Sequence, residues 1–292
     1  MNTRIIKKLL TVLPILALGL AIASEAEARI FIVHCPMKSL QTAVDRANPG
    51  DTINVSSTCN ERIDVRTDDV TIDGGGTAII DGTGLVGTLS LVQVQALNVR
   101  IQNITVQNSP GAGIHVRSSG SAIIEGTTIK DNAADGILVN QSAYARIGSG
   151  LDDHPAAAGT GTGNDIKDNG KSGIAVRSSA TADIFHNSIT GNERGINITN
   201  AGSANIAGND ITDNTARGLS LLTSGAVSLS QNAVHSETNL IEENVIGIRC
   251  RLGGSASGIL QDFGVGNPGT GGTPDSDNTD IIGGCHVSGA VF

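Results

Sequence analysis

The chain has 292 residues, a formal net charge of −9 at pH 7 and a pI near 5.0. Such an acidic chain is a poor candidate for binding nucleic acid or an anionic membrane surface, because both carry the same sign of charge. It has no Trp and a single Tyr, so it lacks the aromatic faces that usually grip neutral sugars.

Residues 1–28 are typical of a secretory signal peptide. Basic residues precede an apolar run over residues 9–23, and Ala26-Glu27-Ala28 matches an A-x-A cleavage site. The apolar run is too short to require a membrane span once cleavage is allowed. We therefore expect an exported protein, periplasmic or extracellular, whose single domain covers residues 29–292 without a transmembrane segment.

A short strand and a helix are expected first, within an N-terminal cap and first coil over residues 29–60. Ser39 is a candidate N-cap, and Asn48-Pro49-Gly50 would stop the helix. A lone amphipathic helix ahead of a repeat array would cover its open end, where unpaired strand edges invite aggregation. The apolar positions that share one face of this helix are Leu40, Ala43, Val44 and Ala47.

The central part of the chain contains a repeat of 22 to 23 residues, seen from Ala182 and again from Ala204. Its template reads A-x-I-x-x-N-x-I-x-x-N, a short turn, then G-I-x-I. Apolar and polar residues alternate, which is the period of a strand and not of a helix. Three short strands per unit predict one coil of a parallel β-helix, with coils stacked about 4.8 Å apart. We expect about nine or ten coils.

Asparagine and glycine recur at fixed places in this template. Stacked Asn side chains can bond to the Asn above and below them, and we expect glycine to permit backbone angles that a β-carbon would forbid. The expected ladder positions are Asn108, Asn132, Asn169, Asn192, Asn214 and Asn244. The expected glycines are Gly113, Gly136, Gly173, Gly195, Gly218 and Gly247.

The segment that leads into the repeats, Ser39-Leu-Gln-Thr-Ala-Val-Asp-Arg-Ala-Asn-Pro-Gly-Asp-Thr-Ile53, resembles secreted right-handed β-helix proteins of the pectin-lyase-like superfamily. The later Asn-x-x-x-Gly-Ile-x-Val units resemble the same superfamily, including the periplasmic β-helix proteins linked to copper-enzyme maturation. The resemblance covers almost all of residues 29–292. It implies an all-β, right-handed parallel β-helix, and it leaves the activity open, since this fold hosts lyases, hydrolases, epimerases, adhesins and proteins without known chemistry.

Two insertions interrupt the repeat, one of about 14 residues within 148–163 and a smaller one near 232–240. The chain is rich in Gly, Pro, Asp and Thr over residues 264–280, which predicts a loop. Residues 281–292 are expected to return as a last strand pair, so residues 264–292 form the predicted C-terminal cap.

Four cysteines in an exported chain indicate disulfides. Cys35 and Cys59 lie in the first cap region, and Cys250 and Cys285 lie in the last. Each end of a solenoid contacts only its neighbours, so the expected bridges are 35–59 and 250–285. There is no C-x-x-C spacing to indicate a metal site.

A hydrolase that resembles the polygalacturonase type would hold two carboxylates across the scissile bond. The resembling hydrolases carry N-T-D, D-D, G-H-G and R-x-K on successive coils, and only Asp135 fits that pattern here. The long insertion adds three catalytic candidates, Asp152, Asp153 and His154, next to the strand of Tyr144. A tolerated surface insertion is the alternative interpretation, and a hydrolase is disfavoured.

A lyase or epimerase needs a cation for the uronate carboxylate and a base for the C5 proton. Outward positions around the G-I-x-V strands supply His115, Arg117 and Arg177, which with Tyr144 are the predicted substrate-binding residues. Arg117 and Arg177 are expected about 10 Å apart, on coils separated by one other coil. Arg grips a carboxylate bidentately, so no aromatic platform is required. Arg249 and Arg251 hold further outward positions, and Arg194 and Arg217 are expected to stack one coil apart just before their glycines.

Asp131 and Asp168 hold equivalent places on adjacent coils. Stacked carboxylates about 5 Å apart can recruit Ca²⁺, which makes Ca²⁺ a candidate cofactor. The alternative is a solvated face on which the pairs Lys130–Asp131 and Lys167–Asp168 balance each other.

Two classes of function follow. The missing acid pair and missing aromatic side chains favour a monomeric, exported protein that binds polysaccharide or cell-envelope material along its flank without catalysis. The clustered arginines support the alternative, a Ca²⁺-assisted lyase or epimerase on an acidic polysaccharide. Whether the protein is an enzyme stays open at this point.

Overall fold

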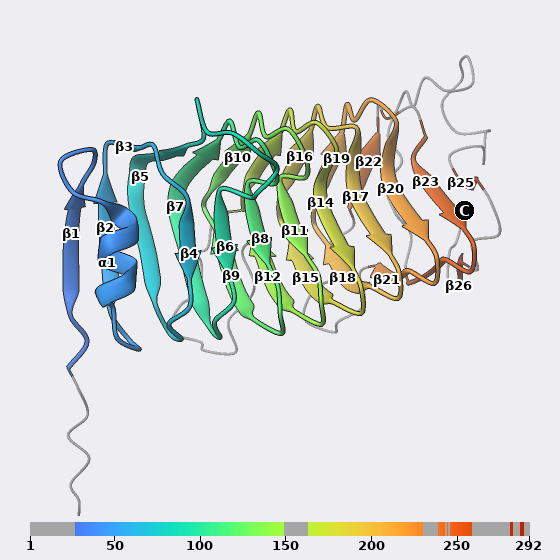
Figure 1. Cartoon of the computed structure of the whole chain (residues 1–292). Helices are drawn as coiled ribbons and strands as arrows, with labels where there is room; N and C mark the ends of the chain where they lie inside the picture. The colour runs from blue at the N-terminus through green and yellow to red at the C-terminus, as the bar shows by residue number, and fades with distance from the viewer. Residues whose placement is uncertain are drawn as a thin grey trace, which may run out of the picture.

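The computed structural model describes residues 27–148, 163–229, 239–242, 244, 246–258, 281–282 and 287–288. Its strands stack into one column, with a single short helix at the N-terminal end of the described residues (Figure 1). All strand pairs with a described register are parallel, from β1–β2 at the start to β24–β26 near the end. No helix among the described residues is long and apolar enough to cross a membrane. The architecture is the predicted right-handed parallel β-helix.

Each coil contributes one strand to a nine-stranded sheet and the rest to a second, larger sheet. The described residues contribute nine strands to this sheet, which is roughly consistent with the expected nine or ten coils. The nine strands are β4 (Ile63–Val65), β6 (Val92–Val94), β8 (Ile114–Val116), β11 (Ile137–Val139), β14 (Ser172–Arg177), β17 (Arg194–Thr199), β20 (Arg217–Leu222), β23 (Ile248–Arg251) and β25 (Ile281–Ile282).

The larger sheet has 17 strands among the described residues and turns a corner within each coil. In the early coils one long strand spans this corner, as β7 does by pairing with both β9 and β10. The strands are β1 (Ile30–His34), β2 (Thr52–Ser56), β3 (Thr58–Cys59), β5 (Thr71–Asp81), β7 (Val99–Gln107), β9 (Ser121–Glu125), β10 (Thr128–Lys130), β12 (Tyr144–Gly148), β13 (Asp165–Lys167), β15 (Thr181–Phe185), β16 (Ser188–Thr190), β18 (Ser203–Ala207), β19 (Asp210–Thr212), β21 (Ala226–Leu229), β22 (Leu240–Glu242), β24 (Ser255–Gly258) and β26 (Val287–Ser288).

The core is a stack of aligned aliphatic side chains. On the nine-stranded sheet Ile114 pairs with Ile137, Ile137 with Ile174 and Ile174 with Ile196, and all four are fully buried. Burial of one such side chain stabilises the fold by about 1.5–3 kcal/mol. The alternation in the sequence is therefore the alternation between this interior and the outer surface.

Two asparagine ladders run along the column, where the sequence predicted one. In the predicted ladder Asn169 donates to Asn192 at 2.9 Å and Asn192 donates to Asn214 at 3.1 Å, in each case from Nδ2 to Oδ1. The second ladder lies at the other corner of the larger sheet and joins Asn164, Asn187, Asn209 and Asn239 with Nδ2–Oδ1 distances of 2.8–2.9 Å. Its members belong to the same repeat template, whose first Asn had no assigned role.

One predicted ladder position is wrong. Ser109, and not Asn108, precedes Asn132 in the ladder, because the Ser109 nitrogen donates to Asn132 Oδ1 at 2.9 Å. Asn108 has a positive φ of 57° and directs its side chain to Asp81 at 3.0 Å. Asn tolerates the left-handed backbone that position 108 requires, and Asn also serves as the ladder residue in later coils. The residue type alone therefore does not show whether position 108 or position 109 belongs to the ladder.

The glycines that precede the strands of the nine-stranded sheet are required by space and not by backbone angle. Gly113, Gly136, Gly173, Gly195 and Gly218 all lack the positive φ that was expected. A β-carbon at Gly195 would lie 2.6 Å from the carbonyl oxygen of Gly218, the equivalent glycine of the next coil. Real carbon atoms do not approach that closely, so the glycine column permits the close stacking of coils.

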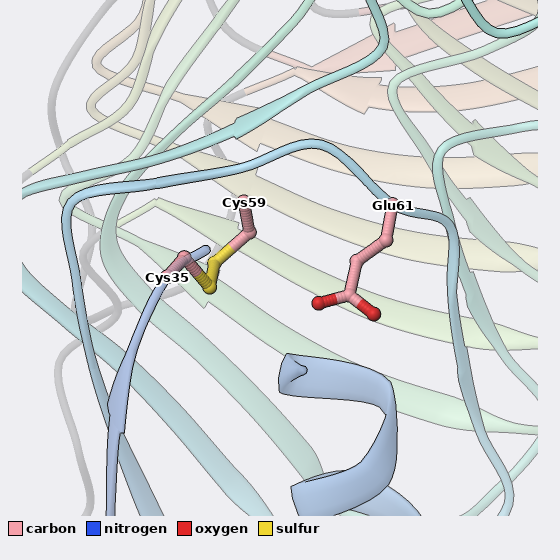
Figure 2. Close-up of side chains that lie close together, drawn as sticks. All are labelled: Cys35, Cys59 and Glu61. Carbon is pink, nitrogen blue, oxygen red and sulfur yellow. A yellow bond between two sulfur atoms is a disulfide. The ribbon is translucent and has the colours of Figure 1, made fainter. Parts of the chain in front are cut away.

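The N-terminal cap forms as predicted. Helix α1 (Leu40–Arg46) begins after the N-cap Ser39, whose Oγ accepts a bond from the Thr42 nitrogen at 3.1 Å. Glu61 adds a second cap, because its carboxylate accepts from Ser39 Oγ at 2.7 Å and from the Leu40 nitrogen at 2.6 Å. Figure 2 shows this carboxylate beside the Cys35–Cys59 disulfide, whose S–S distance is 1.96 Å. The first predicted bridge is confirmed.

At the other end, Cys250 is disulfide-bonded, while its predicted partner Cys285 lies outside the described residues. The predicted signal peptide also lies outside them, except for Glu27 and Ala28.

Both insertions leave the column at the same corner. The first lies between Gly148, at the end of β12, and Gly163, ahead of β13; the second lies between Leu229 and Asn239. This corner carries the second ladder and joins two strands of the larger sheet, so it does not border the nine-stranded sheet. The 148–163 insertion, which carries three of the catalytic candidates, is therefore attached away from that sheet.

Candidate ligand-binding face

The outer surface of the nine-stranded sheet is lined by long polar side chains around a floor of small ones. Its central outward column runs, coil by coil, through His115, Leu138, Ala175, Asn197, Ser220 and Arg249. We call the outward side of β8 to β23, with the residues that flank these strands, the arginine face. The members that give it this name are Arg117, Arg177, Arg194, Arg217, Arg249 and Arg251.

Three residues of the central column, Leu138, Ala175 and Ser220, are buried although they lie on the outward side of the sheet. Leu138 and Ala175 join Ala112 in a small apolar cluster separate from the main core. Ser220 is fully buried. Small side chains become buried here because longer ones in the columns on either side rise beside them. A ligand would therefore rest between the arginine side chains.

The predicted pair Arg117 and Arg177 lies on this face as expected. Val116, Val139 and Val176 are aligned, so Arg117 and Arg177 flank Asn140 on the coil between them. Two coil steps correspond to about 10 Å. Arg117 donates from Nη1 to Gln93 at 3.4 Å.

His115, on β8, is a titratable group two residues before Arg117, and the charges of Arg117 and Arg177 both act on it. Its Nε2 lies 2.9 Å from Asn140 Oδ1. Burial, followed by the charges of Arg117 and Arg177, lowers its pKa below the ordinary value of 6.5 against the opposing effect of Asn140. The imidazole is therefore neutral at pH 7.

Asp135 borders the same face, one column before the strands. It is 5% exposed, and its Oδ1 accepts a bond from the Ser172 nitrogen at 3.1 Å. This bond ties Asp135 to the next coil, which is a structural use of its carboxylate.

A second group of arginines continues the face toward the C-terminal end. Arg194 and Arg217 are register partners on β17 and β20. Arg194 forms an ion pair with Glu193 at 2.6 Å, whereas Arg217 has no carboxylate partner among the described residues. Burial and the charges of Arg249 and Arg194 lower the pKa of Arg217. Arg217 stays protonated, as Arg does in proteins. Its lowered pKa therefore means that the guanidinium is partly buried and lies near other positive charges.

Buried polar atoms without a hydrogen-bond partner are concentrated on this face. Native structures leave few buried polar groups unpaired, and each needs an explanation. Four of them are guanidinium nitrogens, which donate only. The set consists of the Nε atoms of Arg117, Arg194, Arg217 and Arg249, the Oγ atoms of Ser172 and Ser220, and Oδ1 of Asn197. The four Nε atoms and the two serine hydroxyls can donate to a ligand that offers several acceptor oxygens, whereas Asn197 Oδ1 accepts and needs a donor such as a sugar hydroxyl.

Tyr144 does not belong to the arginine face. It begins β12 of the larger sheet, and its hydroxyl donates to Asp183 at 2.6 Å. Burial and the Asp183 carboxylate raise its pKa well above the ordinary value of 10.0. Asn205 donates to the other oxygen of Asp183 at 2.8 Å, so this site is already satisfied from within the protein.

Asp131 and Asp168, the predicted calcium ligands, lie side by side on adjacent coils, but they do not form equivalent ion pairs. The register of β10 and β13 places Asp131 next to Asp168. Lys130 pairs with Asp131 at 3.3 Å, as the alternative interpretation predicted, but Lys167 pairs with Asp165 at 2.5 Å and not with Asp168. The lysine lies closer to Asp165 because residues 165 and 167 point to the same side of β13.

Among the described residues, one group of three possible metal ligands lies close together: Cys35, Cys59 and Glu61. The two cysteines form the disulfide in Figure 2, and Glu61 caps α1. A disulfide has no thiolate to offer a metal. Asp152, Asp153 and His154, the candidates in the long insertion, lie outside the described residues.

Sequence reasoning singled out Arg117 and Arg177 and did not join them to the second group. Arg194 and Arg217 stand two positions before their strand cores, in Glu-Arg-Gly-Ile and Ala-Arg-Gly-Leu. That shared offset predicts that the two arginines stack one coil apart, and the register of β17 and β20 confirms it. The burial of Ser220 and of the Asn197 Oδ1 atom had no signal in the sequence, because polar residues at outward strand positions are normally exposed.

A search of curated proteins finds no match. Three solved structures resemble this one at low sequence identity. Pectate lyase Pel9A is 13% identical over 91% of this chain and 79% of its own, with a TM-score of 0.56. Alginate lyase from Paenibacillus sp. str. FPU-7 is 13% identical over 82% of this chain and 96% of its own, with a TM-score of 0.47. The A-module of the mannuronan C-5 epimerase AlgE6 from Azotobacter vinelandii is 12% identical over 90% of this chain and 87% of its own, with a TM-score of 0.41.

The likeness to the pectate lyase concerns the fold. More than half of the chain, residues 90–263, matches the family described as the right handed beta helix region. This match covers β6 to β24 and thus the whole arginine face. The chain therefore belongs to the right-handed β-helix family.

Proposed function

We propose that the arginine face binds a segment of an acidic polysaccharide, of the polyuronate class, without cleaving it. The observation that carries this proposal is a group of guanidiniums on a chain of net charge −9, in which Arg117, Arg177 and Arg217 form no ion pair with a carboxylate of the residues that the structure describes. The charges of Arg249, Arg194 and Arg251 oppose the protonated form of Arg217, and Glu193 favours it. An acidic protein that gathers cations on one face lowers their repulsion when an anion binds there.

The shape of the ligand follows from the repeat. Equivalent side chains recur about every 4.8 Å along the column, so the face offers a row of sites and not a single pocket. A linear polymer with one carboxylate per unit matches such a row, and each guanidinium can grip a carboxylate bidentately. Pectate, the substrate named for the lyase that shares the fold, is one polyuronate.

Binding without catalysis is favoured by the structural role of Asp135, the carboxylate that borders this face. Asp135 already accepts a bond from the Ser172 nitrogen, and hydrolysis would need two carboxylates across the bond. The alternative is a Ca²⁺-assisted lyase or epimerase. It is supported by His115, a neutral base on β8 two residues before Arg117, since C5 proton abstraction needs a base beside a cation. Asp131 and Asp168 remain the proposed Ca²⁺ ligands for that alternative.

We further propose that the protein acts outside the cytoplasm as a monomer. The Cys35–Cys59 disulfide supports this location, because disulfides persist in oxidising compartments.

The test is a titration of oligouronates of increasing length at low salt, followed by calorimetry. Arg217→Gln and the double variant Arg117→Gln/Arg177→Gln should each weaken binding at least tenfold, and added salt should weaken binding to the wild-type protein. Arg46→Gln is the matched control, because it removes one exposed positive charge at the end of α1. A neutral oligosaccharide should not bind.

The same samples separate binding from catalysis. A lyase would produce unsaturated uronate, seen by its ultraviolet absorbance, and EDTA would abolish it. An epimerase would change the proton NMR spectrum of the polymer. Binding without either change supports the proposal, product formation replaces it by the alternative, and equal affinity of all variants refutes the arginine face as the site.

A further inference from the structure

The chain becomes anchored to the β-helix at Arg29. Its carbonyl oxygen accepts a bond from the Thr52 nitrogen at 2.9 Å, and β1 begins at the next residue. Its guanidinium carbon lies 5.1 Å from the centre of the Phe31 ring. Glu27 and Ala28, just before it, are exposed. Anchoring therefore starts at the residue that follows the A-x-A motif.

A buried carboxylate receives the backbone nitrogen of this first anchored residue. Asp51, which precedes β2, is 1% exposed. Its Oδ1 accepts from the Arg29 nitrogen at 2.7 Å, and its Oδ2 accepts from Arg29 Nη2 and from the Asn48 nitrogen, each at 2.7 Å. These bonds, the Arg29 side chain foremost, lower the pKa of Asp51 to about 2. The carboxylate is ionised and directed at one backbone nitrogen.

We propose that cleavage of the Ala28–Arg29 peptide bond completes this site, by converting the Arg29 nitrogen into an α-ammonium group that forms a buried ion pair with Asp51. In the cleavage, water adds its hydroxyl to the Ala28 carbonyl carbon, the carbon–nitrogen bond breaks and the nitrogen takes the remaining proton of that water; the new Ala28 carboxyl group then releases its proton, and the amine takes up a proton from the solvent. The nitrogen already lies at hydrogen-bond distance from Oδ1, so the folded chain needs no rearrangement. The acceptor of this bond is already ionised, and cleavage makes the donor ionised as well, so a Coulombic attraction between opposite charges is added to the hydrogen bond.

The charges around the new group decide how strongly it is held. Asp51 faces it from the start of β2, and the Arg29 guanidinium occupies the other oxygen of the same carboxylate. The helix side contributes neutral groups, the Arg46 carbonyl, which accepts from Arg29 Nη2 at 3.2 Å, and the Asn48 nitrogen. One carboxylate thus serves two cations, so we expect the α-amino pKa to rise above its ordinary value of about 7.7–8.0 by less than an unshared pair would give.

Processing would then stabilise the first coil in a pH-dependent way. A group whose pKa is raised in the folded state contributes stability that is present below its unfolded pKa and is lost as the pH rises through its folded pKa. The processed chain should therefore exceed an unprocessed one in stability at neutral pH, and the difference should vanish in alkaline solution.

The first measurement is the mass of the protein after export from a bacterial host, which should correspond to Arg29 as the first residue. The α-amino group of that product is then titrated by its rate of reaction with an amine-specific acylating reagent as the pH is raised. Wild type and the control Asp45→Asn, which alters an exposed acid on α1, should show a raised pKa. Asp51→Asn should return it to the ordinary value.

The second measurement compares chains that begin at Arg29 and at Glu27. The longer chain should melt at a lower temperature at about pH 7, with the gap closing above the α-amino pKa. This comparison decides the question even if Asp51→Asn fails to fold. A different first residue, an ordinary α-amino pKa in the wild type, or equal melting temperatures would each overturn the proposal.

Discussion

Replacement of Asn192 by Leu tests the asparagine ladder most directly. The side chain is fully buried, and its Oδ1 accepts from the Asn169 nitrogen at 3.0 Å and from Asn169 Nδ2 at 2.9 Å. Its Nδ2 donates to the carbonyl oxygens of Ile166 and Thr190 at 3.1 and 3.0 Å. Leucine has a similar volume and fits the space, so the change removes hydrogen bonds more than it alters packing.

The cost can be worked out from the groups left behind. The Asn169 nitrogen loses its acceptor, and the Ile166 carbonyl loses a donor from the ladder. A buried polar group without a partner costs about 1–3 kcal/mol. Two such groups, less a small gain from burying leucine, lower the free energy of unfolding by about 2–5 kcal/mol.

The assay is chemical denaturation followed by circular dichroism, with Asn205→Leu as control. Asn205 is exposed and makes one side-chain bond, to Asp183, so its replacement should cost less than about 1 kcal/mol. Asn187→Leu, in the second ladder, should cost as much as Asn192→Leu. A loss below about 1 kcal/mol for Asn192→Leu would refute the reasoning.

Three further outcomes are expected. Because burial lowers the pKa of His115, stability should be full above its ordinary pKa and fall as the pH drops from about 7 to about 5; unfolding curves of His115→Gln should lack this loss. Conversion of Cys35 and Cys59 to Ser should lower the free energy of unfolding by about 3 kcal/mol for a loop of this length, and an unchanged melting temperature would contradict this. Gly195→Ala should cost about 1–3 kcal/mol or more, because its methyl group meets the next coil; a melting curve like that of the wild type would show that the coils can separate there.

The sequence was sufficient for the fold because the signals were local and repeated. Alternation fixed which residues point inward, and the shared spacing from Ala182 and Ala204 placed equivalent residues side by side, as the register confirms. The Cys35–Cys59 bridge followed from the same reasoning, since coils contact only their neighbours.

The bends were less predictable, because several residue types can occupy each bend position. Asn108 and Ser109 are adjacent, and only the bond to Asn132 shows which one belongs to the ladder. The positions of the glycine column were predicted correctly, but the expected reason, a positive φ, was wrong. The actual reason is the close approach between coils, which the local sequence pattern does not reveal. Long side chains were hardest: Lys167 had two acids within reach, and the structure pairs it with Asp165.

The corner that holds the second ladder has a practical consequence for protein engineering. Two coils leave the regular period there, after Gly148 and after Leu229, and both rejoin it at a ladder residue, Asn164 or Asn239. Asn164 directly follows the longer insertion and Asn187 does not, yet their side chains are hydrogen-bonded to each other at 2.9 Å. Lengthening a closed loop costs little, about 0.6 kcal/mol for each doubling. This corner should therefore accept foreign peptides, displayed at intervals of one coil on the side away from the arginine face.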